Sequence, residues 1–276
     1  MRIDAHQHFW RFDPVRDAWI TPEMGAIRRD FLPADLAPLL AESGIDGVVA
    51  VQADQSLAET DFLLGLSAQH SFVKGVVGWI DLRAGDLARR LDGWSGHARL
   101  KGFRHIAQGE PDDFLARDDV VRGIRTIGRL GYAYDILIYP RQLGAAVALV
   151  ARCPDVRFIL DHCAKPPIAS AELATWRTGF RALAVHENVF CKLSGLVTEA
   201  SWSSWTDGQL VPVLDTALEA FGAERLMFGS DWPVCLLAAD YARVAGSLHR
   251  WAARLSDAEQ TCIFGDTAVS AYQLEE

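Results

Sequence analysis

Eight short segments rich in β-branched and apolar residues recur along this chain of 276 residues, and helix-like segments separate them. Several are almost continuously apolar, such as GVVAV and DILIY. Strands that are buried on both faces have this composition, which is typical of a parallel sheet covered by helices. The expected strands are Arg2–His8, Ile45–Ala53, Val73–Leu82, Leu100–Ile106, Tyr132–Tyr139, Arg157–Cys163, Val189–Ser194 and Arg225–Asp231.

This alternation predicts an α/β protein formed by a single (β/α)8 TIM barrel, because eight such units in roughly 250 residues are usual for that fold. A doubly wound open sheet is the structural alternative, and it commonly carries a Gly-rich turn after its first strand. The first strand here ends in His6-Gln7-His8 instead. No linker or low-complexity segment interrupts the pattern, so we expect one domain over residues 1–276.

Local signals mark the ends of the expected helices. Ser56 with Glu59, and Ser256 with Glu259, have the spacing of capping boxes. Gly44 stands where a helix would end in a left-handed glycine. Apolar spacing predicts helices over 142–152, which Pro154 closes, and over 170–187 and 207–222.

Charge and cysteine usage narrow the class of protein. The net charge of −9 disfavours nucleic acid and anionic membranes as partners, because both require clustered positive charge. The N-terminus lacks a signal-peptide pattern, and no run approaches the roughly 20 apolar residues of a membrane span. The scattered cysteines predict a reducing, cytoplasmic compartment. We expect a monomer or a homo-oligomer. The cysteines are Cys153, Cys163, Cys191, Cys235 and Cys262.

The first strand carries the first candidate site residues. His6 and His8 are two apart, so they point to the same face of a strand, and Asp4 is expected on that face one step deeper. Barrel active sites lie at the C-terminal ends of the strands, where these histidines stand. Two hydrogen-bonded structural histidines are the alternative interpretation.

Two later strands end in polar residues. His162 follows FILD, and Asp231 follows LMFGS at the end of the last strand. The first and last strands of a barrel are neighbours, so Asp231 is expected beside the first-strand histidines, as a general base toward water or as a metal ligand. If His162 points inward, alternation turns Asp161 and Cys163 toward the helices, which makes Cys163 a buried, inert thiol.

Cations and aromatic residues are also expected at this rim. Arg104, His105 and Lys192 end strands and could stabilise an oxyanion, with alternation allowing only one of Arg104 and His105 to point inward. A salt bridge to a rim aspartate such as Asp81 or Asp135 is the alternative for these cations. The loop over residues 9–32 is expected to cover the barrel mouth. Aromatic rings that could stack on a sugar are Trp10, Trp79, Tyr139 and Trp232.

Four motifs resemble the amidohydrolase superfamily, within it the amidohydrolase-2 branch that holds the L-fuconolactonases and L-rhamnonolactonases. They are His6-x-His8, Asp161-His162-x-x-Lys165-Pro166, Lys192-Leu-Ser-Gly195 and Gly229-Ser-Asp-Trp-Pro233. The resemblance covers essentially the whole chain. It implies that His6, His8, His162 and Asp231 surround the reacting water.

The resemblance also bears on cofactors. The wider superfamily often has a further histidine on strand five, but this chain has Tyr-Ala-Tyr-Asp-Ile-Leu-Ile-Tyr139 there. This departure argues against a two-metal centre and leaves one divalent ion, with zinc favoured, or none. The ligands of a single ion would be His6, His8, His162 and Asp231.

The resemblance implies a carboxylic-ester hydrolase that opens a small-molecule sugar lactone, L-fuconolactone or a close relative. In this hypothesis Asp231 activates the water, and the remaining catalytic residues are His162, His6 and His8. Substrate-binding candidates are Arg104, His105, Lys192, Trp232, Trp79, Tyr139 and Trp10. The alternatives are a metal-dependent non-oxidative decarboxylase of the same superfamily and a non-catalytic sugar-binding barrel.

Overall fold

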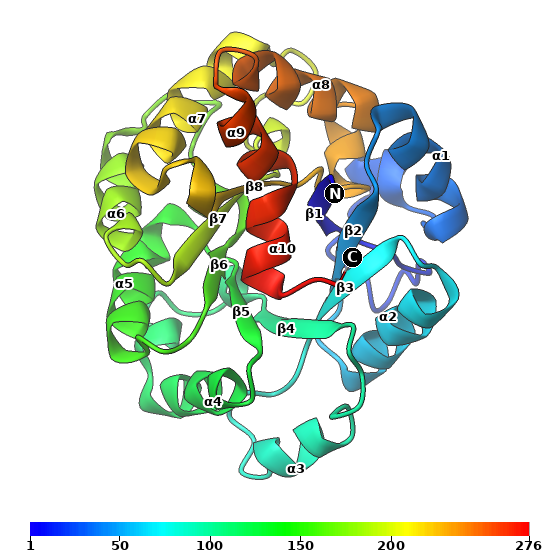
Figure 1. The fold of residues 1–276 in the computed structure, drawn as a ribbon, viewed down its shortest axis with the longest axis vertical. Helices are drawn as coiled ribbons and strands as arrows, with labels where there is room; N and C mark the ends of the chain where they lie inside the picture. The colour runs from blue at the N-terminus through cyan, green and yellow to red at the C-terminus, as the bar shows by residue number, and fades with distance from the viewer. Residues whose placement is uncertain (276) are drawn as a thin grey trace.

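The computed structural model describes residues 1–275, and its centre is an eight-stranded parallel sheet in the order β1 to β8. Figure 1 shows the strands enclosed by a ring of helices. The predicted (β/α)8 barrel is therefore confirmed. The strands are β1 Ile3–Gln7, β2 Gly47–Val51, β3 Val73–Gly78, β4 Leu100–His105, β5 Ala133–Ile136, β6 Phe158–Leu160, β7 Val189–Leu193 and β8 Leu226–Phe228.

The first and last strands meet just beyond the end of β8. The His8 amide donates to the Trp232 carbonyl at 2.7 Å, and the Asp231 amide donates to the His6 carbonyl at 2.8 Å. These bonds join the edges of the sheet at its C-terminal rim. They also place Asp231 directly beside the first-strand histidines.

The helices form an outer layer, and their ends follow the predicted signals closely. Gly44 ends α1 in the left-handed conformation, and the capping box at Ser256 is complete. Only half of the capping box predicted at Ser56 forms. The Ser56 hydroxyl accepts from the Glu59 amide at 3.1 Å, but the Glu59 carboxylate accepts from the Ala53 amide instead of reaching back to Ser56. The helices are α1 Pro33–Ser43, α2 Leu57–Gln69, α3 Leu87–Asp92, α4 Asp118–Arg129, α5 Leu143–Arg152, α6 Ala174–Ala184, α7 Asp207–Phe221, α8 Tyr241–Ala252, α9 Asp257–Thr261 and α10 Thr267–Tyr272.

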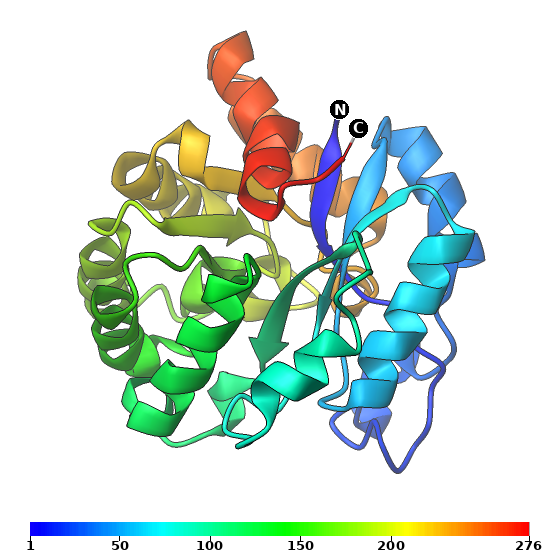
Figure 2. The same ribbon diagram turned by 60° about the horizontal axis from the view of Figure 1, so that its bottom comes forward.

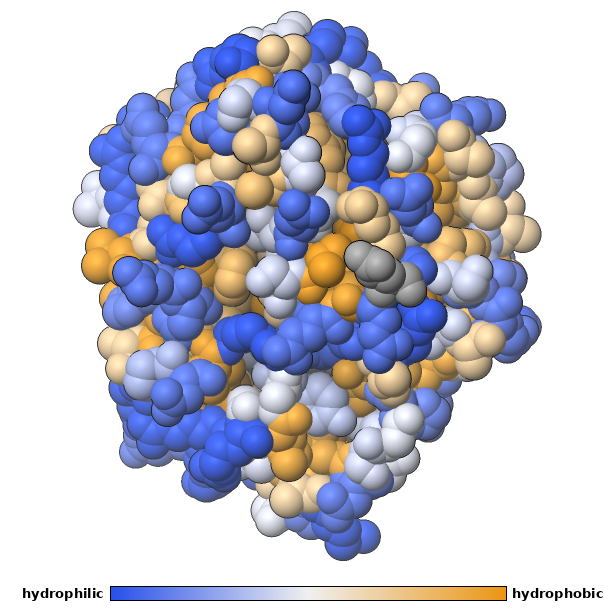
Figure 3. Space-filling view, in the orientation of Figure 1, coloured by the Kyte–Doolittle hydropathy of each residue, from blue (hydrophilic) through white to orange (hydrophobic). Residues whose placement is uncertain are grey.

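The C-terminal helices close the end of the barrel opposite the rim. Figure 2 shows α9 and α10 standing beside the start of β1, near both chain ends. Tyr272 and Leu274 pack with inward-facing strand residues such as Val49, Ile159 and Met227 in one buried cluster. The face that these helices cover is polar with scattered hydrophobic residues (Figure 3). Access to the barrel interior is therefore from the other end.

Within residues 1–275, no helix is long and apolar enough to cross a membrane. The segment 9–32 contains only one short 3-10 helix, Pro22–Ile27, and its Trp10 and Trp19 contribute to the cavity at the barrel mouth. This agrees with the loop expected over the rim.

Candidate active site

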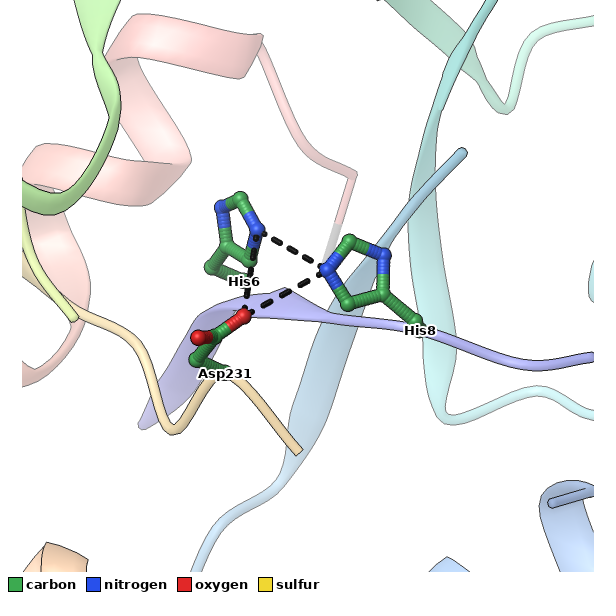
Figure 4. A group of neighbouring side chains, drawn as sticks. All are labelled: His6, His8 and Asp231. Carbon is green, nitrogen blue, oxygen red and sulfur yellow. Dashed lines mark hydrogen bonds and ion pairs between the residues drawn. The ribbon is translucent and has the colours of Figure 1, made fainter. Parts of the chain in front are cut away.

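The two first-strand histidines face each other at the end of β1. Their Nε2 atoms lie 3.2 Å apart, and the Nδ1 atom of His8 contacts the Val51 carbonyl at 2.7 Å. A carbonyl can only accept, so His8 Nδ1 carries a proton, and in the neutral ring Nε2 then presents a lone pair to the site. Figure 4 shows both rings and the Asp231 carboxylate converging on one point.

Asp4 does not share the face of these histidines, which corrects the expectation from strand alternation. Its carboxylate accepts from the Ser230 amide at 2.9 Å and from the Tyr241 hydroxyl of α8 at 3.0 Å, so it faces the helix layer. The pairing of β1 with β2 shifts register between Asp4 and Gln7. This irregularity breaks the alternation on which the prediction depended.

Asp231 follows β8 with a left-handed backbone, φ 58°, which turns its carboxylate toward β1. Its Oδ1 atom lies 3.4 Å from His8 Nε2 and 3.7 Å from His6 Nε2. His162 Nε2 is 4.0 Å from the same oxygen, while His162 Nδ1 contacts the Ser194 hydroxyl at 2.9 Å. The four residues predicted to surround the reacting water are therefore brought together.

Asp161 lies inside the barrel, not against the helices as predicted. It accepts from Arg104 at 2.9 Å and lies 3.2 Å from His6 Nδ1. The physical reason is that β6 ends at Leu160 and that His162 has a left-handed backbone, so strand alternation no longer applies. The burial predicted for Cys163 is confirmed, because its side chain is fully buried.

Lys192 is fully buried beneath the histidines. Its ammonium lies 2.6 Å from Asp135, 3.0 Å from Asp161 and 3.0 Å from His6 Nδ1. Tyr272 of α10 also donates to Asp135 at 2.6 Å. Lys192 thus forms the salt bridge that was the alternative to a pocket cation, and Arg104 is the cation that reaches the site.

Burial and these charges set the protonation states. Burial lowers the pKa of His162 to about 4 and places the pKa of His6 well below its ordinary value. Burial would raise the pKa of Asp231, but the neighbouring histidines, His162 first, hold it well below the usual range. At neutral pH the site therefore contains two uncharged imidazoles beside an ionised carboxylate.

A cavity of about 230 Å³ opens above these groups at the rim. Five predicted residues line it, namely His8, Trp10, Arg104, His162 and Asp231. Other predicted residues lie elsewhere: Trp232 packs against Phe9 and Phe31, and His105 lies between Trp79, Glu110 and Phe114. Tyr139 is outside the lining too, beside Lys165.

Among the polar and aromatic lining residues, sequence reasoning did not single out Trp19, Gln108 and Lys165. Trp19 belongs to the loop expected over the mouth, and Lys165 belongs to the Asp161-His162-x-x-Lys165-Pro166 motif. The position of Lys165 three residues after His162 was the available signal. Gln108 lies in a short 3-10 helix, Ala107–Gly109, just after β4, and no sequence pattern marks it.

The donor set of His6, His8 and Asp231 fits a divalent metal ion. Tetrahedral zinc with bonds of 2.0–2.1 Å separates its ligand atoms by roughly 3.4 Å, and the three separations here are 3.2, 3.4 and 3.7 Å. The hydrogen bond from His8 Nδ1 to a carbonyl is the support that ligating histidines commonly have. These residues could hold one such ion, with His162 in reach as a further ligand.

A (β/α)8 barrel with paired first-strand histidines and an aspartate after the last strand defines a barrel hydrolase. The family model described as Amidohydrolase matches residues 3–274. The chain belongs to this amidohydrolase family.

Several relatives match over nearly the whole chain. An L-fucono-1,5-lactonase of Burkholderia multivorans is 45% identical, covering 100% of this chain and 97% of its own length. An L-fucono-1,5-lactonase of Burkholderia ambifaria is 38% identical, covering 99% of this chain and 96% of its own length. The crystal structure of a Burkholderia multivorans amidohydrolase with bound zinc superposes with a TM-score of 0.97, at 45% identity and full coverage of both chains.

Proposed function

We propose that this protein hydrolyses a sugar lactone to the aldonic acid, and that L-fucono-1,5-lactone is its substrate. The observation that carries the proposal is the Asp231 carboxylate, ionised and in contact with His8 at the floor of a rim cavity. The two lactonases with 45% and 38% identity support the substrate. The five free thiols support a reducing, cytoplasmic setting.

Water is the nucleophile in this proposal. Asp231 accepts a proton from the water as its oxygen bonds to the lactone carbonyl carbon. Arg104 and His162 line the same cavity and would donate to the carbonyl oxygen as it becomes an oxyanion. When the tetrahedral adduct collapses, the bond between the carbonyl carbon and the ring oxygen breaks. Asp231 returns its proton to that oxygen, which becomes the hydroxyl of the acid.

A divalent ion held by His6, His8 and Asp231, with zinc favoured, would supply acidification of the attacking water. The low pKa of Asp231 makes its carboxylate a weak base on its own, and this supports a role for such an ion. Among the proposed ligands, His6 has a fixed ring orientation, because Asp161 and Lys192 both contact its Nδ1 atom. The resemblance to a zinc-containing crystal structure supports this choice of ion.

The test is acid release from a panel of sugar lactones, followed with a pH indicator, before and after treatment with a chelator. L-Fucono-1,5-lactone should be opened fastest, with L-rhamnonolactone and sugar lactones of other configuration as comparisons. The release of carbon dioxide from aromatic acids is measured in parallel. Decarboxylation without lactone opening would contradict the proposal, as would sugar binding with no turnover.

A further inference from the structure

Lys165 reaches the cavity by an unusual backbone path. Four consecutive residues after β6, His162 to Lys165, have left-handed backbones with φ of 54°, 51°, 58° and 52°. None is glycine, so this conformation costs stability and needs support from its surroundings. The Lys165 amide donates to the His162 carbonyl at 2.8 Å, and Trp176 donates to the Cys163 carbonyl at 2.7 Å. The turn therefore presents His162 and Lys165 to one cavity while Cys163 and Ala164 are buried.

The Lys165 ammonium has donors to spare. Its Nζ atom lies 3.0 Å from Glu199 Oε1, and the two side chains are only 17% and 20% exposed. Within residues 1–275, Glu199 is the one acceptor recorded for this ammonium. An ammonium carries three N–H groups, so two remain for a molecule in the cavity.

In the described part of the chain, Gln108 has an unpaired hydrogen-bond acceptor, whereas Lys165 has unpaired donors. Its Oε1 atom is buried and has no hydrogen-bond partner among the described residues, although the side chain lines the cavity. Its backbone is anchored, because Arg141 donates to the Gln108 carbonyl at 3.0 Å. An unpaired buried acceptor is costly, so a ligand donor would be favoured at this position. Gln108 thus has an unused acceptor in the side chain that forms part of the cavity wall, and Lys165 has unused N–H donors there.

Other residues of the cavity wall are apolar. Trp10, Leu137 and Val234 line it, and the Trp10 ring is fixed by a hydrogen bond to the Arg29 carbonyl at 2.8 Å. A ligand that fits must therefore have both hydroxyl groups and an apolar side. A hydroxylated lactone ring has this chemistry.

We propose that Lys165, paired with Glu199 and assisted by Gln108, binds the ring hydroxyl groups of the substrate and sets specificity for polyhydroxylated lactones. In this proposal Lys165 orients the lactone ring by binding its hydroxyl groups. Asp231 and Arg104 act on the lactone carbonyl. This inference rests on the proposed lactone hydrolysis.

The test compares L-fucono-1,5-lactone with δ-valerolactone, which has the same ring and no hydroxyl group. Lys165→Met and Gln108→Leu should each lower kcat/KM for the sugar lactone at least about tenfold more than for δ-valerolactone, mainly through KM. Lys165→Arg should restore part of the loss. Lys74→Met, on the partly exposed side of β3, is the control for lysine removal.

Equal losses on both substrates in Lys165→Met and Gln108→Leu, with normal wild-type turnover, would overturn this inference alone, because a group acting on the carbonyl affects both lactones alike. Absence of wild-type turnover on every sugar lactone would overturn the proposed function and this inference with it. Thermal melting of each variant identifies any that fail to fold, and Gln108→Leu then tests the subsite independently of Lys165.

Discussion

His8 Nε2 and Asp231 Oδ1 lie 3.4 Å apart, although the two residues stand at opposite ends of the chain. The contact exists because the Asp231 amide bonds to the His6 carbonyl where the barrel closes. It joins an ionised carboxylate to an imidazole whose other nitrogen is committed to Val51. The pair is the centre of the proposed chemistry.

Asp231→Asn should therefore reduce kcat by about a hundredfold or more, because an amide cannot accept the proton of water. The fold should be retained, since the amide has nearly the shape of the carboxylate. Steady-state kinetics with L-fucono-1,5-lactone and a thermal melt check both points. Asp155→Asn, at an exposed position, is the matched control. Near-normal turnover in Asp231→Asn would show that another group is the base.

Chelator-treated protein should take up about one zinc ion per chain, because His6, His8 and Asp231 have separations that suit one tetrahedral ion. His8→Gln should weaken this uptake strongly. Titration calorimetry and elemental analysis measure affinity and stoichiometry. Full turnover by protein shown to be free of metal would contradict a role for the ion.

Lys192→Met should destabilise the fold by about 3–5 kcal/mol, because it leaves the buried Asp135 and Asp161 carboxylates without their shared cation. Chemical denaturation measures the change in the free energy of unfolding. The double variant Lys192→Met/Asp135→Asn should recover part of the loss, since it removes one of the two stranded charges. A loss below about 1 kcal/mol in the single variant would mean that water or protonation compensates for the missing cation.

We expect Glu59 to make the free energy of unfolding depend on pH. Burial raises its pKa from 4.5 to about 7, so the folded state binds this proton more tightly than the unfolded state does. Stability from this group is complete below pH 4.5 and is lost as pH rises through 7.

Glu59→Gln should consequently be more stable than wild type at pH 8, by on the order of 2 kcal/mol. Its free energy of unfolding should also vary less between pH 4.5 and 7. The amide oxygen can still accept from Ala53, so the local fold has no reason to change. Glu42→Gln, at an exposed position of α1, serves for comparison. A pH profile parallel to that of wild type would indicate that Glu59 titrates normally.

The sequence alone determined the barrel and the four residues at its centre. Apolar runs that alternate with helix-like segments are typical of a covered parallel sheet, and in a closed barrel the C-terminal strand ends meet at one rim. His6, His8, His162 and Asp231 follow from that rule, because each stands at a strand end and the closed barrel brings strand ends together.

Only the tertiary structure decided where the neighbouring charges point. Asp4 and Asp161 both lie opposite to the expected faces, because a register shift in β1 and a left-handed turn after β6 interrupt strand alternation. The same turn brings Lys165 into the cavity, whereas Lys192 is drawn beneath the site by Asp135 and Asp161. Alternation is a property of regular strands, and functional side chains here stand where the strands stop being regular.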